Sequence, residues 1–150
     1  MTRRIELARE RGDFATIGTE SSNLSMVERQ LGNLARAERL AREALRIAER
    51  RGDRWAIPYG LNGLAAVAVE TGELRRAATL LGAAAALQER QGNAWPPDEA
   101  PHFRRSRAAA ALALGPGRFQ EAWSAGRHLP PDQAVSFALA PLAVEAEVAS

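Results

Sequence analysis

The chain has 150 residues, enough for one domain with its own core. It carries 20 basic and 18 acidic residues, a net charge of +2, and every basic residue is arginine. The absence of cysteine and lysine excludes disulfides, thiol catalysis, cysteine-bound metals, a P-loop lysine and Schiff-base chemistry. With 32 alanines and eight aromatic residues, the composition predicts an all-α protein whose helices approach closely.

Glycines recur at an even spacing of twenty residues through the first two thirds of the chain. Each is followed directly by Asp, Asn or Glu, and the glycines are Gly12, Gly32, Gly52, Gly72 and Gly92. A glycine just beyond a helix can adopt the left-handed conformation that ends it, and an Asp or Asn after it can cap the next helix. Twenty residues therefore make one helix with its turn, and forty make an antiparallel pair.

The predicted elements start with half a repeat. Residues 1–12 are expected to form the second helix of a truncated pair, with Ile5, Leu7 and Ala8 facing the next unit. Each unit of a repeat array buries its apolar face only against its neighbours. A homodimer through this uncapped N-terminal face is therefore one expectation.

Residues 13–92 are predicted to form two helix pairs, with helices over 14–31, 34–51, from Pro58 towards Gly72, and over 74–91. In the first helix, Leu24, Val27 and Leu31 recur at helical spacing, which predicts an apolar face. The second has a broad apolar face over 37–48. In the last, Gly82 and the alanines that follow it allow a neighbouring backbone to come very close.

Residues 93–150 are predicted to be a divergent third unit with a C-terminal helix. The segment NAWPPDEAP, residues 93–101, contains three prolines and is expected to be a rigid loop. Helices are then expected over 102–114, over 118–126 with Phe119, Ala122 and Trp123 on one face, and from Gln133 to near Pro141. The three units together are expected to form one domain.

The apolar runs are too short to cross a membrane. The runs Ala77–Leu87 and Ala134–Val144 are each well short of the roughly 20 residues that a membrane helix needs. No apolar segment follows Arg3 and Arg4, as it would in a signal peptide. A cytoplasmic protein without a membrane partner is therefore expected.

The order of large and small residues in the second pair resembles the tetratricopeptide repeat. The residues that carry this resemblance are large at Leu61, Leu64 and Leu81, small at Ala65, Ala77 and Ala84, and glycine at Gly72. The forty-residue length, against about 34 in the usual repeat, indicates a divergent member. The resemblance implies an α-solenoid of antiparallel helix pairs with a divergent C-terminal helical cap.

Residues 78–139 resemble a more specific family. They are similar to the C-terminal end of the helical-repeat sensor region in large actinobacterial regulators, which combine an ATPase, a MalT-like repeat array and often a LuxR-type helix-turn-helix. The residues that carry this resemblance are Leu80, Leu81, Gly82, Ala83, Pro96, Pro97, Phe119, Ala122, Trp123, Gly126, Arg127, Leu129, Asp132, Ala134 and Ala138. It implies a scaffold and sensing surface. Because the sequence has no GxxxxGK[ST] motif, the chain is expected to be a fragment, a truncated relative or a stand-alone repeat protein.

The leading helices of tetratricopeptide arrays line the inner surface of the superhelix. The resemblance therefore implies a partner-binding face made of Met26, Arg29, Tyr59, Asn62, Ala66 and Val69. The partner expected there is a protein, a peptide, an effector or the upstream domains of a larger regulator. Trp55, Trp95 and Trp123 each stand near a helix boundary and are expected to cover helix ends in the core.

A second function class is a small arginine-rich nucleic-acid-binding protein. Arg104, Arg105 and Arg107 are the candidate anion patch. Few aromatic residues interleave with them and no DNA-reading motif contains them, so direct nucleic-acid binding is the alternative rather than the expectation. A steep loss of affinity with salt would support it.

The third class is a hydrolase. Its triad would use Ser106, one of two histidines (His102 or His128) and one of two aspartates (Asp98 or Asp132), but there is no nucleophile elbow. The two histidines lack a carboxylate at ligand spacing, and each is expected to be exposed, at a helix start or in a turn. We therefore expect no catalytic residues, no metal site and no cofactor.

Overall fold

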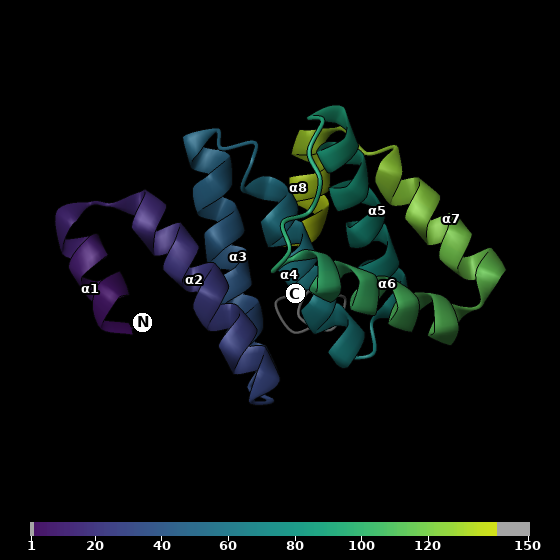
Figure 1. Cartoon of the computed structure of the whole chain (residues 1–150), viewed down its shortest axis with the longest axis horizontal. Coiled ribbons are helices and arrows are strands. Elements are labelled where there is room, and N and C mark those ends of the chain that lie inside the picture. Colours follow the sequence, from purple (N-terminus) through teal and green to yellow (C-terminus); the bar gives the residue numbers. More distant parts are fainter. Residues whose placement is uncertain (1, 141–150) are drawn as a thin grey trace, which may run out of the picture.

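The computed structural model describes residues 2–140, and the secondary structure of these residues is all helical, as the composition predicts (Figure 1). The helices are joined by short turns, apart from the predicted loop, which ends at Glu99; the third proline, Pro101, lies in the first turn of α6, so the predicted end of the loop was wrong. Their bounds are α1 (Thr2–Arg11), α2 (Phe14–Gln30), α3 (Leu34–Arg51), α4 (Ile57–Glu70), α5 (Leu74–Arg90), α6 (Ala100–Leu114), α7 (Pro116–Arg127) and α8 (Pro131–Leu139). The prediction for the end of α8 involved Pro141, which lies outside the described residues.

The five evenly spaced glycines end their helices in the same way. All five have positive φ, between 64° at Gly52 and 86° at Gly32. The amide of the residue after each glycine donates to the carbonyl five positions earlier, as in Asp13 to Ala8 at 2.8 Å. This is the Schellman arrangement, and it pairs carbonyl groups that the helix itself leaves open. The predicted left-handed glycine stops are confirmed.

The predicted side-chain caps form only in part. Asp13 caps α2, because its Oδ1 accepts from the amide of Thr16 at 3.2 Å. Asn33 makes no side-chain cap, so that prediction was wrong for α3. Asn33 instead donates from Nδ2 to Glu28 at 2.6 Å, which turns its amide back towards α2.

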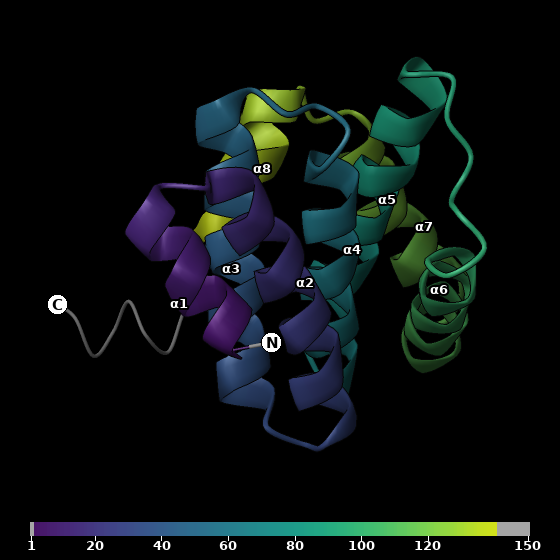
Figure 2. The same cartoon turned by 60° about the vertical axis from the view of Figure 1, so that its left-hand side comes forward.

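The helices stack as antiparallel pairs, α2 with α3 and α4 with α5, and α6 and α7 cover the open side of the second pair (Figures 1 and 2). The helix α8 turns back and packs on α3, α4 and α5. The leading helices α2 and α4 and the start of α6 therefore share one side of the molecule, with α8 on the opposite side (Figure 2).

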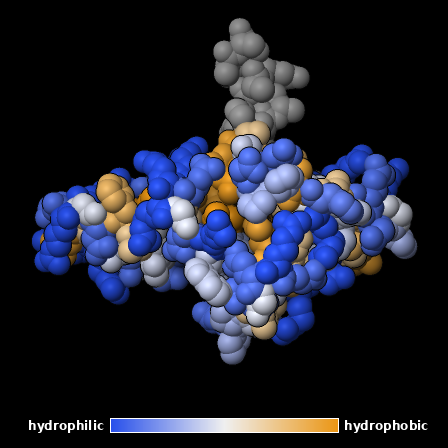
Figure 3. All heavy atoms as spheres, turned by 90° about the horizontal axis from the view of Figure 1, so that it is seen from above, coloured by the Kyte–Doolittle hydropathy of each residue, from blue (hydrophilic) through white to orange (hydrophobic). Residues whose placement is uncertain are grey.

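Two apolar clusters hold the stack together. The larger is centred on α5, where Leu80, Leu81 and Ala84 are fully buried, and it extends from α3 to α8. The smaller joins α1, α2 and α3 through Ile5, Ala8, Ile17, Leu24 and Ile47. Seen from above, the surface is mostly hydrophilic, with hydrophobic residues showing near the middle (Figure 3). None of the described helices is long and apolar enough to cross a membrane.

The closest helix contact is the crossing of α5 and α7. A Cβ atom placed on Gly126 would lie 1.9 Å from the carbonyl oxygen of Thr79, and one on Gly82 would lie 2.2 Å from that of Trp123. Two backbones therefore touch directly, with glycine on both sides. The close approach predicted at Gly82 is confirmed, and its partner is α7.

The apolar face predicted for α2 was wrong in two of its three residues. Leu24 is buried, but Val27 is 37% exposed and Leu31 is 69% exposed. The buried face of α2 is largely polar, because neighbouring helices supply hydrogen-bond and ion-pair partners for its side chains. Ser25 donates to the carbonyl of Ala37 at 2.6 Å, and the buried carboxylate of Glu20 pairs with Arg4 at 3.1 Å.

Candidate interaction groove

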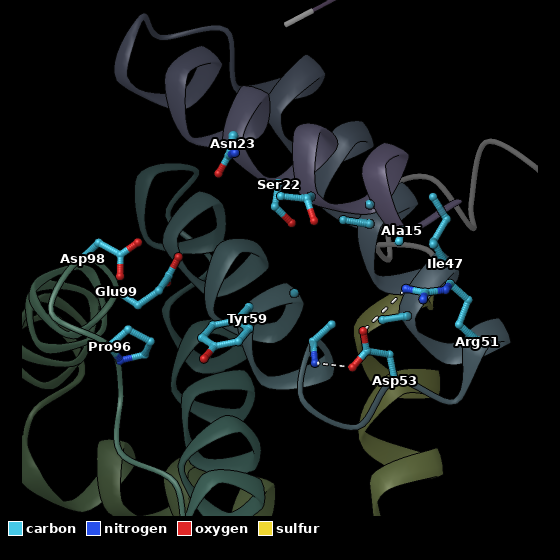
Figure 4. A pocket seen from close by; sticks show the side chains of 16 residues that line it. Ala15, Ser22, Asn23, Ile47, Arg51, Asp53, Tyr59, Pro96, Asp98 and Glu99 are labelled. Carbon is cyan, nitrogen blue, oxygen red and sulfur yellow. Dashed lines mark hydrogen bonds and ion pairs between the residues drawn. The ribbon is translucent and has the colours of Figure 1, made fainter. Parts of the chain in front are cut away.

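Two adjoining cavities open on the side formed by α2, α4 and the start of α6, and Figure 4 shows the residues that line the larger one. The larger has a volume of about 470 Å³ and the narrower about 50 Å³. Ser22, Tyr59, Gly60 and Glu99 line both cavities, so the two form one depression, here named the interaction groove. The larger volume is in the range of pockets that hold small ligands or several side chains.

The groove is hollow because the helix faces around it carry small residues. Gly18 and Ser22 on α2, and Gly60 and Gly63 on α4, leave space that larger side chains would fill. Gly60 has a second role, because a Cβ atom there would lie 3.0 Å from Cδ1 of Leu45. Because Gly60 has no Cβ atom, α4 packs tightly on α3, and this contact forms the floor of the groove.

Five of the six residues predicted as a partner-binding face line the narrower cavity. They are Met26, Arg29, Tyr59, Asn62 and Ala66. Val69 does not line either cavity. It stands next to Glu70, whose carboxylate pairs with Arg29 at 2.9 Å and so joins α2 to α4. The positive charge of Arg29 is therefore already neutralised.

The loop before α6 supplies groove residues that the sequence did not single out for this site. Glu99 accepts a hydrogen bond at 2.9 Å from Nδ2 of Asn62, which is only 2% exposed. Oδ1 of Asn62 and Nδ1 of His102 are buried and have no hydrogen-bond partner among the described residues. His102 lines the narrower cavity and is half-buried, so its prediction as an exposed residue was wrong. These residues come together only when α6 packs beside α4.

Tyr59 sits at the centre of the groove, between Ser22 and the loop residue Pro96 (Figure 4). Its ring meets Trp95 edge-on at 5.8 Å, and Trp95 stacks on Phe103 at 5.0 Å. Burial raises the pKa of the Tyr59 phenol, and the nearby charges of Glu99 and Asp98 raise this pKa further. The groove therefore has an acidic side and an aromatic wall.

The three arginines predicted as an anion patch all lie on α6, in different surroundings. The guanidinium of Arg107 lies 4.4 Å above the ring of Trp123, a cation–π contact that anchors it. Arg104 and Arg105 are exposed and make no ion pair with any described residue. Trp123 is buried in the core and Trp95 packs against it as a partly buried residue, whereas Trp55 is 62% exposed and lies outside the core.

Among the described residues, Ser106, Asp98 and Asp132 make no hydrogen bond with His102 or His128. Across residues 2–140, no three His, Asp or Glu side chains are grouped so that they could hold a metal ion. Nδ1 of His128 lies 2.7 Å from the carbonyl oxygen of Ser124, one turn earlier on α7. Ser106 is buried in α6.

Comparison of the chain with protein-family models, with curated proteins and with solved structures found no match.

Proposed function

We propose that this chain is a non-catalytic helical-repeat interaction module that binds a segment of a protein partner in the interaction groove. The observation that carries the proposal is the groove's composition: small residues from two successive leading helices leave an open channel, while Asn62 and Tyr59 place polar groups along it. Channels of this kind suit an extended peptide, whose backbone and alternate side chains need both space and hydrogen-bonding partners.

We also propose which type of repeat the chain contains and in which kind of larger protein it acts. Glycines in the left-handed conformation recur every twenty residues, and this spacing supports a divergent tetratricopeptide-type array. The resemblance of residues 78–139 to MalT-like regions supports a role as the sensor or scaffold part of a LuxR-type transcriptional regulator. In that setting the partner is either a separate protein or the upstream domains of the same regulator.

The test is selection from a displayed library of random peptides, with a matched pair of variants. Ser22→Trp places a large ring where both cavities meet, whereas Gln30→Trp places the same ring at an exposed position at the end of the same helix. Far-UV circular dichroism checks that both variants are folded.

Peptides selected on the natural chain are expected to bind Gln30→Trp equally well and to lose about tenfold or more in affinity for Ser22→Trp. A library that yields no binder, or binders indifferent to Ser22→Trp, would overturn the proposal.

The arginine-rich nucleic-acid alternative has one observation in its favour, the exposed and unpaired state of Arg104 and Arg105. Binding of short DNA and RNA duplexes across a salt series decides it. A steep fall in affinity with salt that Arg104→Gln reduces would support the alternative. No binding at low salt would remove it.

A further inference from the structure

We infer that the interaction groove accepts a basic peptide segment, with an arginine or lysine side chain held at the end formed by Asp98, Glu99 and Asn62. The inference rests on the proposed function and specifies its ligand. It gives the groove a preference for charge that the tetratricopeptide resemblance does not imply.

The charges around the larger cavity favour a basic ligand. Most described glutamates pair with an arginine of this arginine-rich chain, as Glu70 does with Arg29 at 2.9 Å. Asp98 and Glu99, which both line the larger cavity, have no such partner among the described residues. The third carboxylate of the cavity, Asp53, is already paired with Arg51 at 3.6 Å. Two negative charges on the rim are therefore left for a ligand.

Unpaired hydrogen-bonding atoms in the groove favour the same kind of ligand. A carboxylate only accepts, so the bond between Asn62 and Glu99 fixes the amide with its Nδ2 towards Glu99 and leaves Oδ1 as a free acceptor. This oxygen is buried on a residue that is 2% exposed and lines the groove, and it has no donor among the described residues. Nδ1 of His102 is a second unpartnered atom in the same cavity. A buried acceptor without a donor costs free energy, so a ligand rich in N–H groups gains by donating to Oδ1 of Asn62.

Guanidinium and ammonium groups meet both requirements. They are positively charged and carry several N–H donors but no acceptor, and arginine can also stack on an aromatic ring such as that of Tyr59. An acidic segment would meet repulsion from the rim, and an apolar one would leave the buried Oδ1 of Asn62 unpaired.

The position of the two acidic residues before α6 has a local cause as well, since negative charge is favourable at a helix N-terminus. That cause does not explain their orientation. Glu99 makes no side-chain cap on α6, and its carboxylate points instead to Asn62 across the groove.

The test uses the peptides selected from the random library and synthetic versions in which each arginine is replaced by citrulline and each lysine by glutamine. Binding of each labelled peptide is measured by fluorescence anisotropy on the natural chain, on Glu99→Gln and on Glu121→Gln. Glu121 is an exposed carboxylate on α7 and is the control for the same change of charge.

We expect the groove-bound peptides to share a basic residue whose neutral replacement weakens binding about tenfold or more. Glu99→Gln should weaken the basic peptide by a similar factor and the neutral peptide little, while Glu121→Gln leaves both unchanged. Peptides that Ser22→Trp excludes, but that lack a basic residue or bind Glu99→Gln as well as the natural chain, would overturn this inference and leave the proposed function standing. Failure to select any groove-dependent peptide would instead count against the proposed function.

Discussion

At the scale of single residues, small side chains determine where two helices pack in backbone contact and where a cavity remains between them. Gly126 and Gly82 bring α5 and α7 into backbone contact, and Gly60 does nearly the same for α4 and α3. Gly18 and Gly63, by contrast, face the groove and leave it empty. The same residue type therefore serves packing at one site and binding space at another.

Gly126→Ala is expected to destabilise the fold by about 3 kcal/mol, because its methyl group would meet the Thr79 carbonyl and force α5 and α7 apart. Gly117→Ala on the same helix is the matched control, since a Cβ atom there has no neighbour within 4 Å. It should be neutral or stabilise by up to about 1 kcal/mol. Urea unfolding followed by circular dichroism measures both. Equal midpoints for the two variants would contradict the described crossing.

Tyr59 reports on the charge of the groove because it is the only tyrosine in the chain. Its pKa is raised above the ordinary 10.0 by burial and by the charges of Glu99 and Asp98. Glu99→Gln keeps an acceptor for Asn62 but removes one charge, so the Tyr59 pKa should fall towards 10.0 while burial keeps it above that value. Absorbance of the tyrosinate during a pH titration measures it.

The raised pKa of Tyr59 makes the stability of the fold decrease at high pH. Because the folded state favours the neutral phenol, the contribution of Tyr59 is complete below the unfolded pKa and is lost as pH rises through the folded pKa. Glu121→Gln on α7 should leave the Tyr59 pKa unchanged. A Glu99→Gln variant with an unchanged or higher pKa would place the carboxylate away from the ring.

At the scale of elements, α8 is held by its buried apolar face and also by its C-terminal end. It has only nine residues, too few to be stable alone. Arg42 on α3 donates to the carbonyls of Leu139 and Ala140 at 3.0 and 3.3 Å, and Arg76 on α5 donates to that of Ala138 at 2.7 Å. The last carbonyls of a helix are unpaired and carry partial negative charge, so two guanidinium groups both satisfy and neutralise that end.

Arg42→Gln should loosen α8 without unfolding the stack. Loss of charge-assisted hydrogen bonds of about 1.5 to 3 kcal/mol is expected to raise amide exchange in α8 about tenfold or more. Arg46→Gln, an exposed position one turn later on α3, changes the same charge and should leave α8 protected. Hydrogen–deuterium exchange of both variants gives the comparison, and equal protection would mean that α8 is held by its apolar face alone.

At the scale of the whole molecule, the two apolar clusters predict unequal stability along the chain. The larger cluster ties α3 to α8 through α5, while the smaller one holds α1 and α2 against α3. Helical-repeat arrays are stabilised by contacts between neighbours, so one end can open without the other.

Leu81→Ala should lower the free energy of unfolding by about 2 to 5 kcal/mol, because Leu81 is fully buried in the larger cluster. Ile17→Ala removes a similar volume from the smaller cluster. It should raise amide exchange in α1 and α2 while α5 stays protected. Denaturant unfolding and exchange measurements separate the two outcomes. A loss below about 0.5 kcal/mol for Leu81→Ala would be typical of a surface position and would contradict its place in the core.

The sequence by itself determined the helices and their ends. Glycine at a left-handed stop and proline in a first turn act within one or two turns of chain, so the pattern of Gly52 and Pro58 predicts structure without knowledge of the neighbours. The apolar faces of α3, α5 and α7 were predicted for the same reason. Their period is helical and their buried side is apolar or small, except for Gln88 on α5.

Only the tertiary structure decided which polar residues are buried and what the groove contains. The polar face of α2 is buried because partners such as Arg4 and the Ala37 carbonyl lie on other helices. The sequence predicted five groove residues on α2 and α4, but not that Glu99 meets Asn62, 37 positions away. Hydrogen bonds and charge pairs between distant segments depend on how helices pack, and no local period along the chain encodes that geometry.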